Sequence, residues 1–272
     1  GEDVVEHFIS CQTHDSLFFF TDSGKVFNVK AYELPNLPRA AKGRGVANFL
    51  EISSQEKVLS VFPWSKKDLE LGIKYLVIVT KNGIIKRVPL EQFENVRRSG
   101  LRAITLRPDD LVKKVVKTRG KDHIIIITKK GQGIRIPEEG IRAMGRTAAG
   151  VKGIRMKKGD EIIGMEVIGI DADKQHLLII SENGCGKRTA VSQFKTQGRG
   201  GSGIKAAQIT AKTGDLVATA ALTGQEEDII VVSKKGQVIR TNVNLIPILG
   251  RATQGVKVMR LDGDKVASVA CV

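Results

Sequence analysis

The stretch that decides the fold is Ile124-Ile125-Ile126-Ile127-Thr128-Lys129-Lys130-Gly131, because the chain of 272 residues repeats its pattern five times. A short apolar run leads through a polar turn to a glycine. The other copies are Phe18-Phe19-Phe20 with Gly24, Leu76 to Val79 with Gly83, Leu177 to Ile180 with Gly184, and Ile229 to Val232 with Gly236. These glycines are 59, 48, 53 and 52 residues apart. Such a period, built from short strands, is typical of blade-like β units.

Each repeat predicts four strands: an opening strand, the apolar strand covered on both faces, a third strand after the glycine turn, and a short fourth strand. The sequence therefore predicts an all-β array of four-stranded blades in one domain, 1–272. The repeats are 1–55, 56–109, 110–159, 160–213, 214–260 and a partial one at 261–272.

The partial repeat predicts an incomplete sixth blade. Because the chain opens at Gly1 without a methionine, we interpret it as an excised fragment whose missing strands lay upstream of Gly1. We expect the C-terminal run, Val266 to Val272, to pair near the N-terminal end of the array.

The net charge of +15, from 44 Lys and Arg against 29 Asp and Glu, favours a polyanionic partner. Only 4% of residues are aromatic, whereas single-strand binders need stacking platforms, so double-stranded nucleic acid is favoured. An anionic membrane surface ranks lower because no amphipathic helix is visible. A basic β-propeller that binds proteins remains an alternative.

A second glycine follows each turn glycine by 19 residues in four repeats and by 17 in the other, and cations flank it. Small residues let a backbone approach a phosphate, and Arg and Lys add charge-assisted contacts. The candidate DNA-binding residues here are Arg39, Lys42, Arg44, Arg97, Arg98, Arg102, Arg146, Lys152, Arg199, Lys205, Arg251 and Lys257. Regular repetition predicts a basic track along one rim. The alternative is that these cations are only solvated edge charges.

The third strand of four repeats carries an arginine at the fourth position after the turn glycine. These further candidates are Arg87, Arg135, Arg188 and Arg240, and Asn28 takes the position in the first repeat.

No catalytic, metal or cofactor site is expected. Cys11, Cys185 and Cys271 are too scattered for a disulfide framework or a metal knuckle, and the four histidines are equally dispersed. Asp109-Asp110 and the acidic cluster at 226–228 are interpreted as solvated loop charge. No phosphate-binding P-loop signature is present.

The chain resembles the C-terminal domain of the DNA gyrase A protein. The residues that carry the resemblance are His14-Asp15 before Phe18-Phe19-Phe20, Gly24-Lys25-Val26, Met144 to Ile154, Gly186-Lys187-Arg188-Thr189 and Gly250 to Val256. The similar C-terminal domain of topoisomerase IV is the nearest rival. The resemblance implies a six-bladed β-pinwheel that is not itself catalytic and wraps double-stranded DNA with positive writhe.

By the same resemblance, the domain supports negative supercoiling by an ATP-dependent A2B2 holoenzyme in the bacterial cytoplasm, associated with the nucleoid. The family's hallmark box has the form Q-R-R-G-G-K-G. Here Gln197-Gly198-Arg199-Gly200-Gly201-Ser202-Gly203 is similar, but it departs from the box at Gly198 and Ser202 and lies in the fourth repeat.

Overall fold

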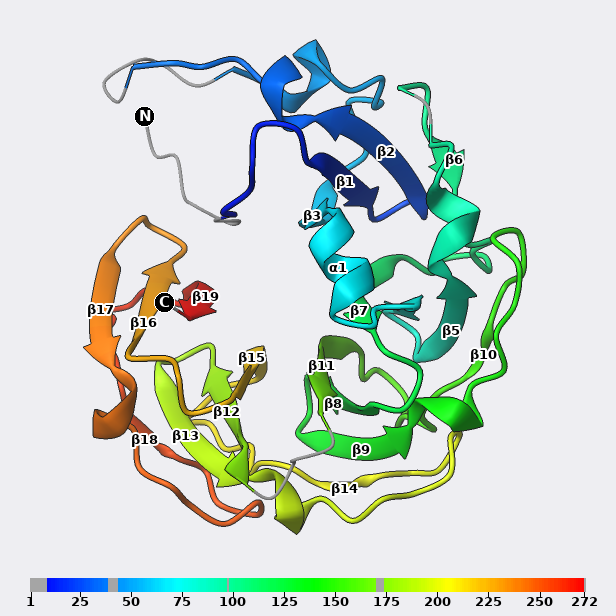
Figure 1. The fold of residues 1–272 in the computed structure, drawn as a ribbon. Helices are drawn as coiled ribbons and strands as arrows, with labels where there is room; N and C mark the ends of the chain where they lie inside the picture. Colours follow the sequence, from blue (N-terminus) through cyan, green and yellow to red (C-terminus); the bar gives the residue numbers. More distant parts are fainter. Residues whose placement is uncertain (1–8, 39–43, 97, 170–173, 272) are drawn as a thin grey trace.

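A computed structural model describes residues 9–38, 44–96, 98–169 and 174–271, which form five antiparallel sheets around a common centre (Figure 1). The first sheet has the order β3-β1-β2-β6, formed by Val58–Trp64, Ser16–Thr21, Lys25–Lys30 and Leu101–Arg102. The second has the order β7-β4-β5-β10, formed by Val112–Thr118, Tyr75–Thr80, Ile84–Pro89 and Val151–Lys152. The third has the order β11-β8-β9-β14, formed by Ile162–Ile168, His123–Thr128, Gln132–Pro137 and Ile204–Lys205.

The fourth sheet has the order β15-β12-β13-β18, formed by Leu216–Leu222, His176–Ser181, Cys185–Ala190 and Val256–Lys257. The fifth has three strands, β19-β16-β17, formed by Val266–Cys271, Asp228–Ser233 and Val238–Asn242. Helical segments are short: α1 (Lys66–Glu70), η1 (Ala31–Glu33), η2 (Val46–Asn48), η3 (Leu90–Phe93), η4 (Glu138–Gly140), η6 (Val191–Gln193) and η7 (Val243–Leu245).

Every hairpin turn uses a hydroxyl three residues before its glycine. Thr80 Oγ1 accepts the backbone N–H of Ile84 at 3.1 Å, and Gly83 between them has φ +80°. The same acceptor is Thr21, Thr128, Ser181 or Ser233 in the other hairpins. Glycine tolerates the positive φ that the turn needs, and the hydroxyl satisfies a backbone donor of the tight turn.

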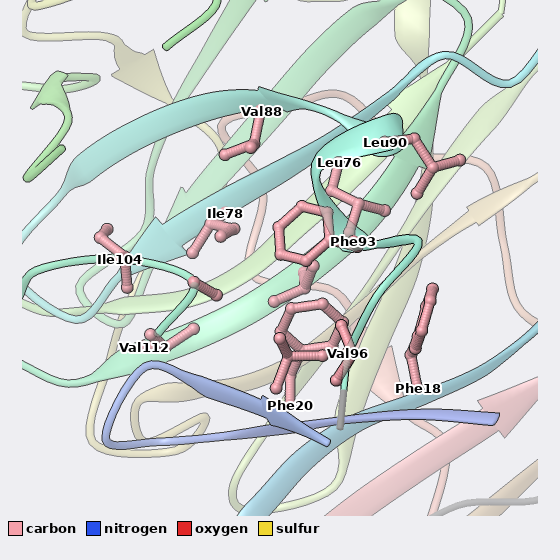
Figure 2. Packing of buried hydrophobic residues seen from close by; sticks show 13 residues of the cluster. Phe18, Phe20, Leu76, Ile78, Val88, Leu90, Phe93, Val96, Ile104 and Val112 are labelled. Carbon is pink, nitrogen blue, oxygen red and sulfur yellow. The ribbon is translucent and has the colours of Figure 1, made fainter. Parts of the chain in front are cut away.

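The five apolar runs form strands that are largely buried, as predicted. In the three middle sheets, alternate residues of the run face the two neighbouring sheets. Leu76 and Ile78 of β4 pack with Phe18 and Phe20 of β1 in one cluster (Figure 2). Val77 and Val79 of the same strand pack with the third sheet, in a separate cluster with Ile124 and Ile126. A strand buried on both faces has to be apolar at consecutive positions, which explains the unbroken runs.

The expectation that each repeat forms its own blade is wrong. The opening strand of each repeat pairs with the hairpin of the repeat before it, as β3 does with β1 and β7 with β4. The short fourth strand also pairs one blade back, as β6 does with β2 and β10 with β5. Each four-stranded sheet therefore combines two strands from each of two consecutive repeats, which ties the repeats together.

The incomplete sixth blade is not observed. Among the described residues, Val266–Cys271 pairs with β16 in the three-stranded fifth sheet and makes no sheet with the N-terminal end of the array. The last strand joins the fifth sheet for the reason given above: each opening strand pairs with the hairpin of the repeat before it. We call this pairing with the preceding repeat the one-blade offset. The opening strand of the first repeat is expected at residues 3–9. Except for Ile9, these residues lie outside the described part of the chain.

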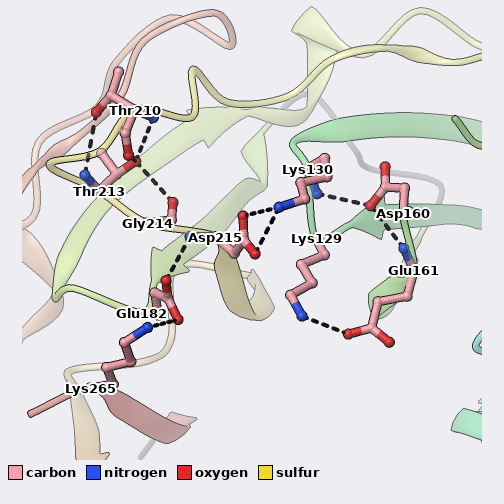
Figure 3. Close-up of polar contacts among 10 residues, drawn as sticks. All are labelled: Lys129, Lys130, Asp160, Glu161, Glu182, Thr210, Thr213, Gly214, Asp215 and Lys265. Atoms are coloured by element: carbon pink, nitrogen blue, oxygen red, sulfur yellow. Dashed lines mark hydrogen bonds and ion pairs between the residues drawn. The ribbon is translucent and has the colours of Figure 1, made fainter. Parts of the chain in front are cut away.

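Acidic residues before the opening strands bind the turns of neighbouring hairpins (Figure 3). Asp160 Oδ1 accepts the N–H of Lys130 at 3.0 Å, and Lys130 Nζ lies 2.7 Å from Asp215 Oδ1. In the second sheet, Asp110 Oδ1 accepts the N–H of Asn82 at 2.9 Å and the residue is buried, so its interpretation as solvated loop charge is wrong. Asp110 Oδ1 also accepts the N–H of Leu111 at 2.9 Å, so this side chain satisfies two backbone donors near the turn.

We expect Gly150→Ala to destabilise the chain by about 3 kcal/mol, since it combines strained backbone with overpacking. Gly150 has φ +86°, and a Cβ there would lie 2.8 Å from the Ile85 carbonyl oxygen. The matched control is Gly159→Ala, where φ is +77° but nothing lies within 4 Å, and about 1 kcal/mol is expected. Urea unfolding measures both, and equal losses would show that the contact with β5 is unimportant.

Candidate nucleic-acid interface

The outermost strand of each four-stranded sheet carries a cation at the same place. These strands, β6, β10, β14 and β18, lie on the outer edge of the array (Figure 1). Each has two residues, and the second is exposed and basic: Arg102, Lys152, Lys205 and Lys257. The structure thus places four predicted site residues at equivalent positions on one edge.

A loop precedes each of the last three outer strands, and both its ends pair with the strand next to the outer one. In the second sheet, Ala143 bridges Arg87 and Val151 pairs with Ile85. Only Lys86 separates those two partners on β5, so residues 144–150 bulge outward as a loop. The corresponding loops run from Thr196 to Ile204 and from Ile248 to Val256.

Each loop carries one of the predicted arginines, and each arginine donates to a backbone carbonyl. Arg146 Nη1 lies 3.4 Å from the Arg102 oxygen, and Arg251 Nη1 lies 2.6 Å from the Lys205 oxygen. Exposed Arg199 donates through Nε to the Gly140 oxygen at 3.1 Å. A guanidinium has five N–H donors, so one such bond leaves capacity for a phosphate oxygen.

Hydrogen bonds connect each of the first three outer strand regions to the next loop. We call the four outer strands and the three loops together the outer band. The N–H of Arg155, just after β10, donates to the Gly201 oxygen in the next loop at 2.8 Å. The N–H of Gln208, just after β14, donates to the Thr253 oxygen at 3.0 Å. Thr105 Oγ1, after β6, donates to the Thr147 oxygen at 2.7 Å. The predicted cations of four repeats therefore lie on a connected surface.

The glycine that ends each loop has a structural role of its own. Gly150, Gly203 and Gly255 all have positive φ, and a Cβ on any of them would lie within 2.8 Å of a carbonyl oxygen of the strand next to the outer one. Packing against the neighbouring strand is therefore enough to explain why these three positions are glycine. Close approach to a phosphate, which the sequence suggested as the reason, is not needed. The flanking cations carry the argument for a binding surface.

The third-strand arginines have partners within the protein. The Arg87 guanidinium carbon lies 4.5 Å from the centre of the Tyr75 ring, and Arg188 Nε donates to the Ile246 oxygen at 2.7 Å. Arg135 Nε donates to His123 Nδ1 at 3.0 Å, and burial, followed by the Arg135 charge, lowers the pKa of His123. Exposed Arg240 pairs with Asp228 at 2.6 Å. Contact of these arginines with DNA stays a prediction.

The first two repeats contribute fewer of the predicted cations to the described surface. Arg39, Lys42 and Arg97 lie outside the described residues. Arg44 is exposed, and exposed Arg98 lies 3.1 Å from the Glu33 carboxylate.

Sequence reasoning missed two buried lysines beneath this band. Lys86 and Lys187 occupy the strand position that is Phe27, Ile134 or Ile239 in the other repeats. The signal was a lysine at a position that is apolar in every other repeat. Exposed Arg155 and Arg260, which follow β10 and β18, were also absent from the predicted DNA-binding residues.

The described residues offer neither a metal site nor a membrane-crossing helix. No group of three or more His, Cys, Asp or Glu side chains there could hold a metal ion. No helix in that part of the chain is long and apolar enough to cross a membrane.

The family model "DNA gyrase C-terminal domain, beta-propeller" matches this chain five times, at residues 15–65, 74–119, 122–168, 175–223 and 227–272. The chain belongs to this family. The expected resemblance is therefore confirmed. The five matches each cover one hairpin and the opening strand that follows it, so their boundaries agree with the sheets and not with the predicted repeat boundaries.

Curated relatives support the same family. The DNA gyrase A protein of Staphylococcus epidermidis is 42% identical over 272 residues, and that of Staphylococcus aureus is 41% identical over 267. These matches cover 100% and 98% of this chain but 30% of each relative, so the chain spans under a third of their length.

Two solved structures have the same fold. A structure of the DNA gyrase A C-terminal domain has a TM-score of 0.81 at 28% identity, covering 96% of this chain and 83% of its own. The C-terminal domain of DNA topoisomerase IV has a TM-score of 0.84 at 26% identity, covering 97% and 81%.

Proposed function

We propose that this chain is a non-catalytic module that bends and wraps double-stranded DNA around its outer band. The observation that carries the proposal is the alignment of Arg102, Lys152, Lys205 and Lys257 on equivalent outer strands, with arginine-bearing loops between them. Cations that recur at one edge of successive sheets follow a curved path, which suits a polyanion that bends around the array.

Electrostatics alone accounts for this function, without base recognition. Each phosphate that a Lys or Arg neutralises releases condensed counterions, which favours binding to any sequence. Smooth bending of a 20–30 base-pair segment by 40–90° costs about 1–6 kcal/mol, which several such contacts offset. Sequence tolerance and strong salt dependence are therefore expected.

Membership in the gyrase family extends the proposal to the whole protein. The module would serve an A2B2 gyrase in the bacterial cytoplasm, where wrapping with positive writhe lets ATP-driven strand passage introduce negative supercoils. No cofactor is assigned to this module. Topoisomerase IV stays a second candidate for the parent enzyme because of the similarity to its C-terminal domain, at a TM-score of 0.84.

Ligation of a singly nicked plasmid in the presence of the chain tests wrapping directly. If DNA wraps with positive writhe, sealing the nick should trap positively supercoiled circles, in proportion to the chain bound. A mobility shift on random-sequence duplex at low salt is the companion measurement. Binding without a change in topoisomers would contradict wrapping, and absence of any shift would contradict the DNA-binding function itself.

A further inference from the structure

Two loops of the outer band are held from inside the protein by buried lysines. Lys86 is 0% exposed, and its Nζ donates to the oxygens of Ala103 at 2.8 Å and of Arg146 at 2.5 Å. Lys187 is 1% exposed, and its Nζ donates to the oxygens of Gly250 at 3.0 Å, Arg251 at 2.6 Å and Thr253 at 3.0 Å. Each ammonium thus replaces its lost hydration with backbone carbonyls, at least one of which belongs to a loop.

A glutamine holds the other side of the same loop residue. Gln92 Oε1 accepts the N–H of Arg146 at 3.0 Å, and Gln193 Oε1 accepts the N–H of Arg251 at 3.0 Å. Lys86 and Gln92 are six residues apart in the sequence, as are Lys187 and Gln193. Both backbone polar atoms of each loop arginine are therefore fixed by the preceding hairpin.

The loop between these two lacks both the lysine and the glutamine, although the N–H of Arg155 donates to its Gly201 oxygen. Beneath it, Ile134 takes the lysine position, and Gly140 takes the glutamine position. Its sequence, Arg199-Gly200-Gly201-Ser202, includes two glycines where the held loops have none, and Gln132 Nε2 donates to the Ser202 oxygen at 2.8 Å. Loops with and without a lysine and a glutamine beneath the arginine therefore alternate along the band.

We infer that Lys86 and Lys187 are positioning residues for DNA binding, which fix Arg146 and Arg251 before DNA arrives and leave the glycine-rich loop of Arg199 to adapt. The inference rests on the proposed function. Pre-organised groups bind with less loss of conformational freedom, whereas a flexible loop can follow variation in the DNA path. Two fixed contacts would set the direction of the wrapped segment, and the loop between them would accommodate its shape.

The protonation behaviour of the lysines agrees with this environment. Burial, and next the charge of the nearby loop arginine, lowers the pKa of Lys86 to about 8, and the same causes lower the pKa of Lys187 to about 8. The ammonium form is nevertheless favoured near neutral pH, where its three protons suit the three carbonyls around Lys187.

A double-mutant cycle between Lys187 and Arg251 tests the inference. Lys187→Met should weaken binding to random-sequence duplex roughly fivefold, a change on the scale of one charge-assisted hydrogen bond. Arg251→Ala should weaken it to a similar or larger degree. In the Arg251→Ala background, Lys187→Met should have no further effect, because the lysine acts through the arginine.

Three further measurements separate positioning from a general loss of stability. Gln193→Ala, a change at an exposed residue, should weaken DNA binding in the same direction with an intact fold. Amide hydrogen exchange in Lys187→Met should speed up at residues 251–255 and stay unchanged at 198–203. Ile134→Val, a mild core change at the equivalent position, should leave DNA affinity unchanged.

The outcomes distinguish the inference from the function on which it rests. If Arg251→Ala leaves DNA affinity unchanged, the proposed function fails at this loop. If Arg251→Ala weakens binding but Lys187→Met does not, or if the two effects add fully, the positioning role is overturned and the proposed function stands.

Discussion

Replacing six cations of the outer band with alanine should weaken binding to every duplex sequence alike, by more than a hundredfold at about 0.1 M salt. The residues are Arg146, Lys152, Arg199, Lys205, Arg251 and Lys257. Each lost phosphate contact should also flatten the plot of log affinity against log salt by about one unit. Titration of two unrelated duplexes at several salt concentrations measures both effects. The fold should survive, because none of the six side chains lies in the core.

The control removes the same charge elsewhere. Six exposed cations that belong neither to the outer strands nor to the loops before them are Lys67, Lys74, Lys113, Arg119, Lys121 and Lys174. Their replacement with alanine should change the salt dependence little. Equal losses for the two variants would mean that net charge, and not the outer band, drives binding. A loss confined to one duplex would indicate base recognition.

Strand positions were predictable from the sequence because the physical constraint is local. Residues such as Val77 and Ile78 face different neighbouring sheets, so both have to be apolar. Thr80 and Gly83 mark the turn by equally local chemistry. The period alone could not reveal which strands share a sheet, because a repeat length does not determine where each structural unit begins and ends. The one-blade offset of β6 and β10 therefore appeared only in the structure.

The candidate site was predicted in part for a similar reason. Cations at a fixed distance from a glycine predict one edge, and the structure brings Lys152, Lys205 and Lys257 to equivalent places there. Their contact with DNA stays a prediction. For Lys86 and Lys187 the sequence shows a lysine at an otherwise apolar strand position, but it does not reveal the role of that lysine. A strand lysine is normally exposed, and the carbonyls that compensate its burial lie mostly about 60 residues away in the sequence.

A buried carboxylate predicts the second large effect. Glu138 is 0% exposed, and its Oε1 accepts the backbone N–H groups of Gly120 at 2.7 Å and Asp122 at 2.8 Å. Its Oε2 accepts the Thr118 hydroxyl at 2.6 Å and lies 3.8 Å from Arg87 Nη1. Glu138→Ala should therefore lower the free energy of unfolding by about 4 kcal/mol, because it leaves buried donors unsatisfied and Arg87 without its counter-charge.

Glu138→Gln separates the hydrogen bonds from the charge. The amide oxygen can still accept from Gly120 and Asp122, and the amide nitrogen can donate to the Thr118 oxygen, so about 1–2 kcal/mol should be lost, chiefly from the missing charge near Arg87. Urea unfolding of the two variants at pH 7 measures the difference. The equivalent residues Leu90, Val191 and Val243 are apolar. A Glu138→Ala variant as stable as Glu138→Gln would therefore show that the turn at 118–122 needs no side-chain acceptor at this position. The carboxylate would then serve mainly to hold Arg87, and DNA affinity should change in both variants together.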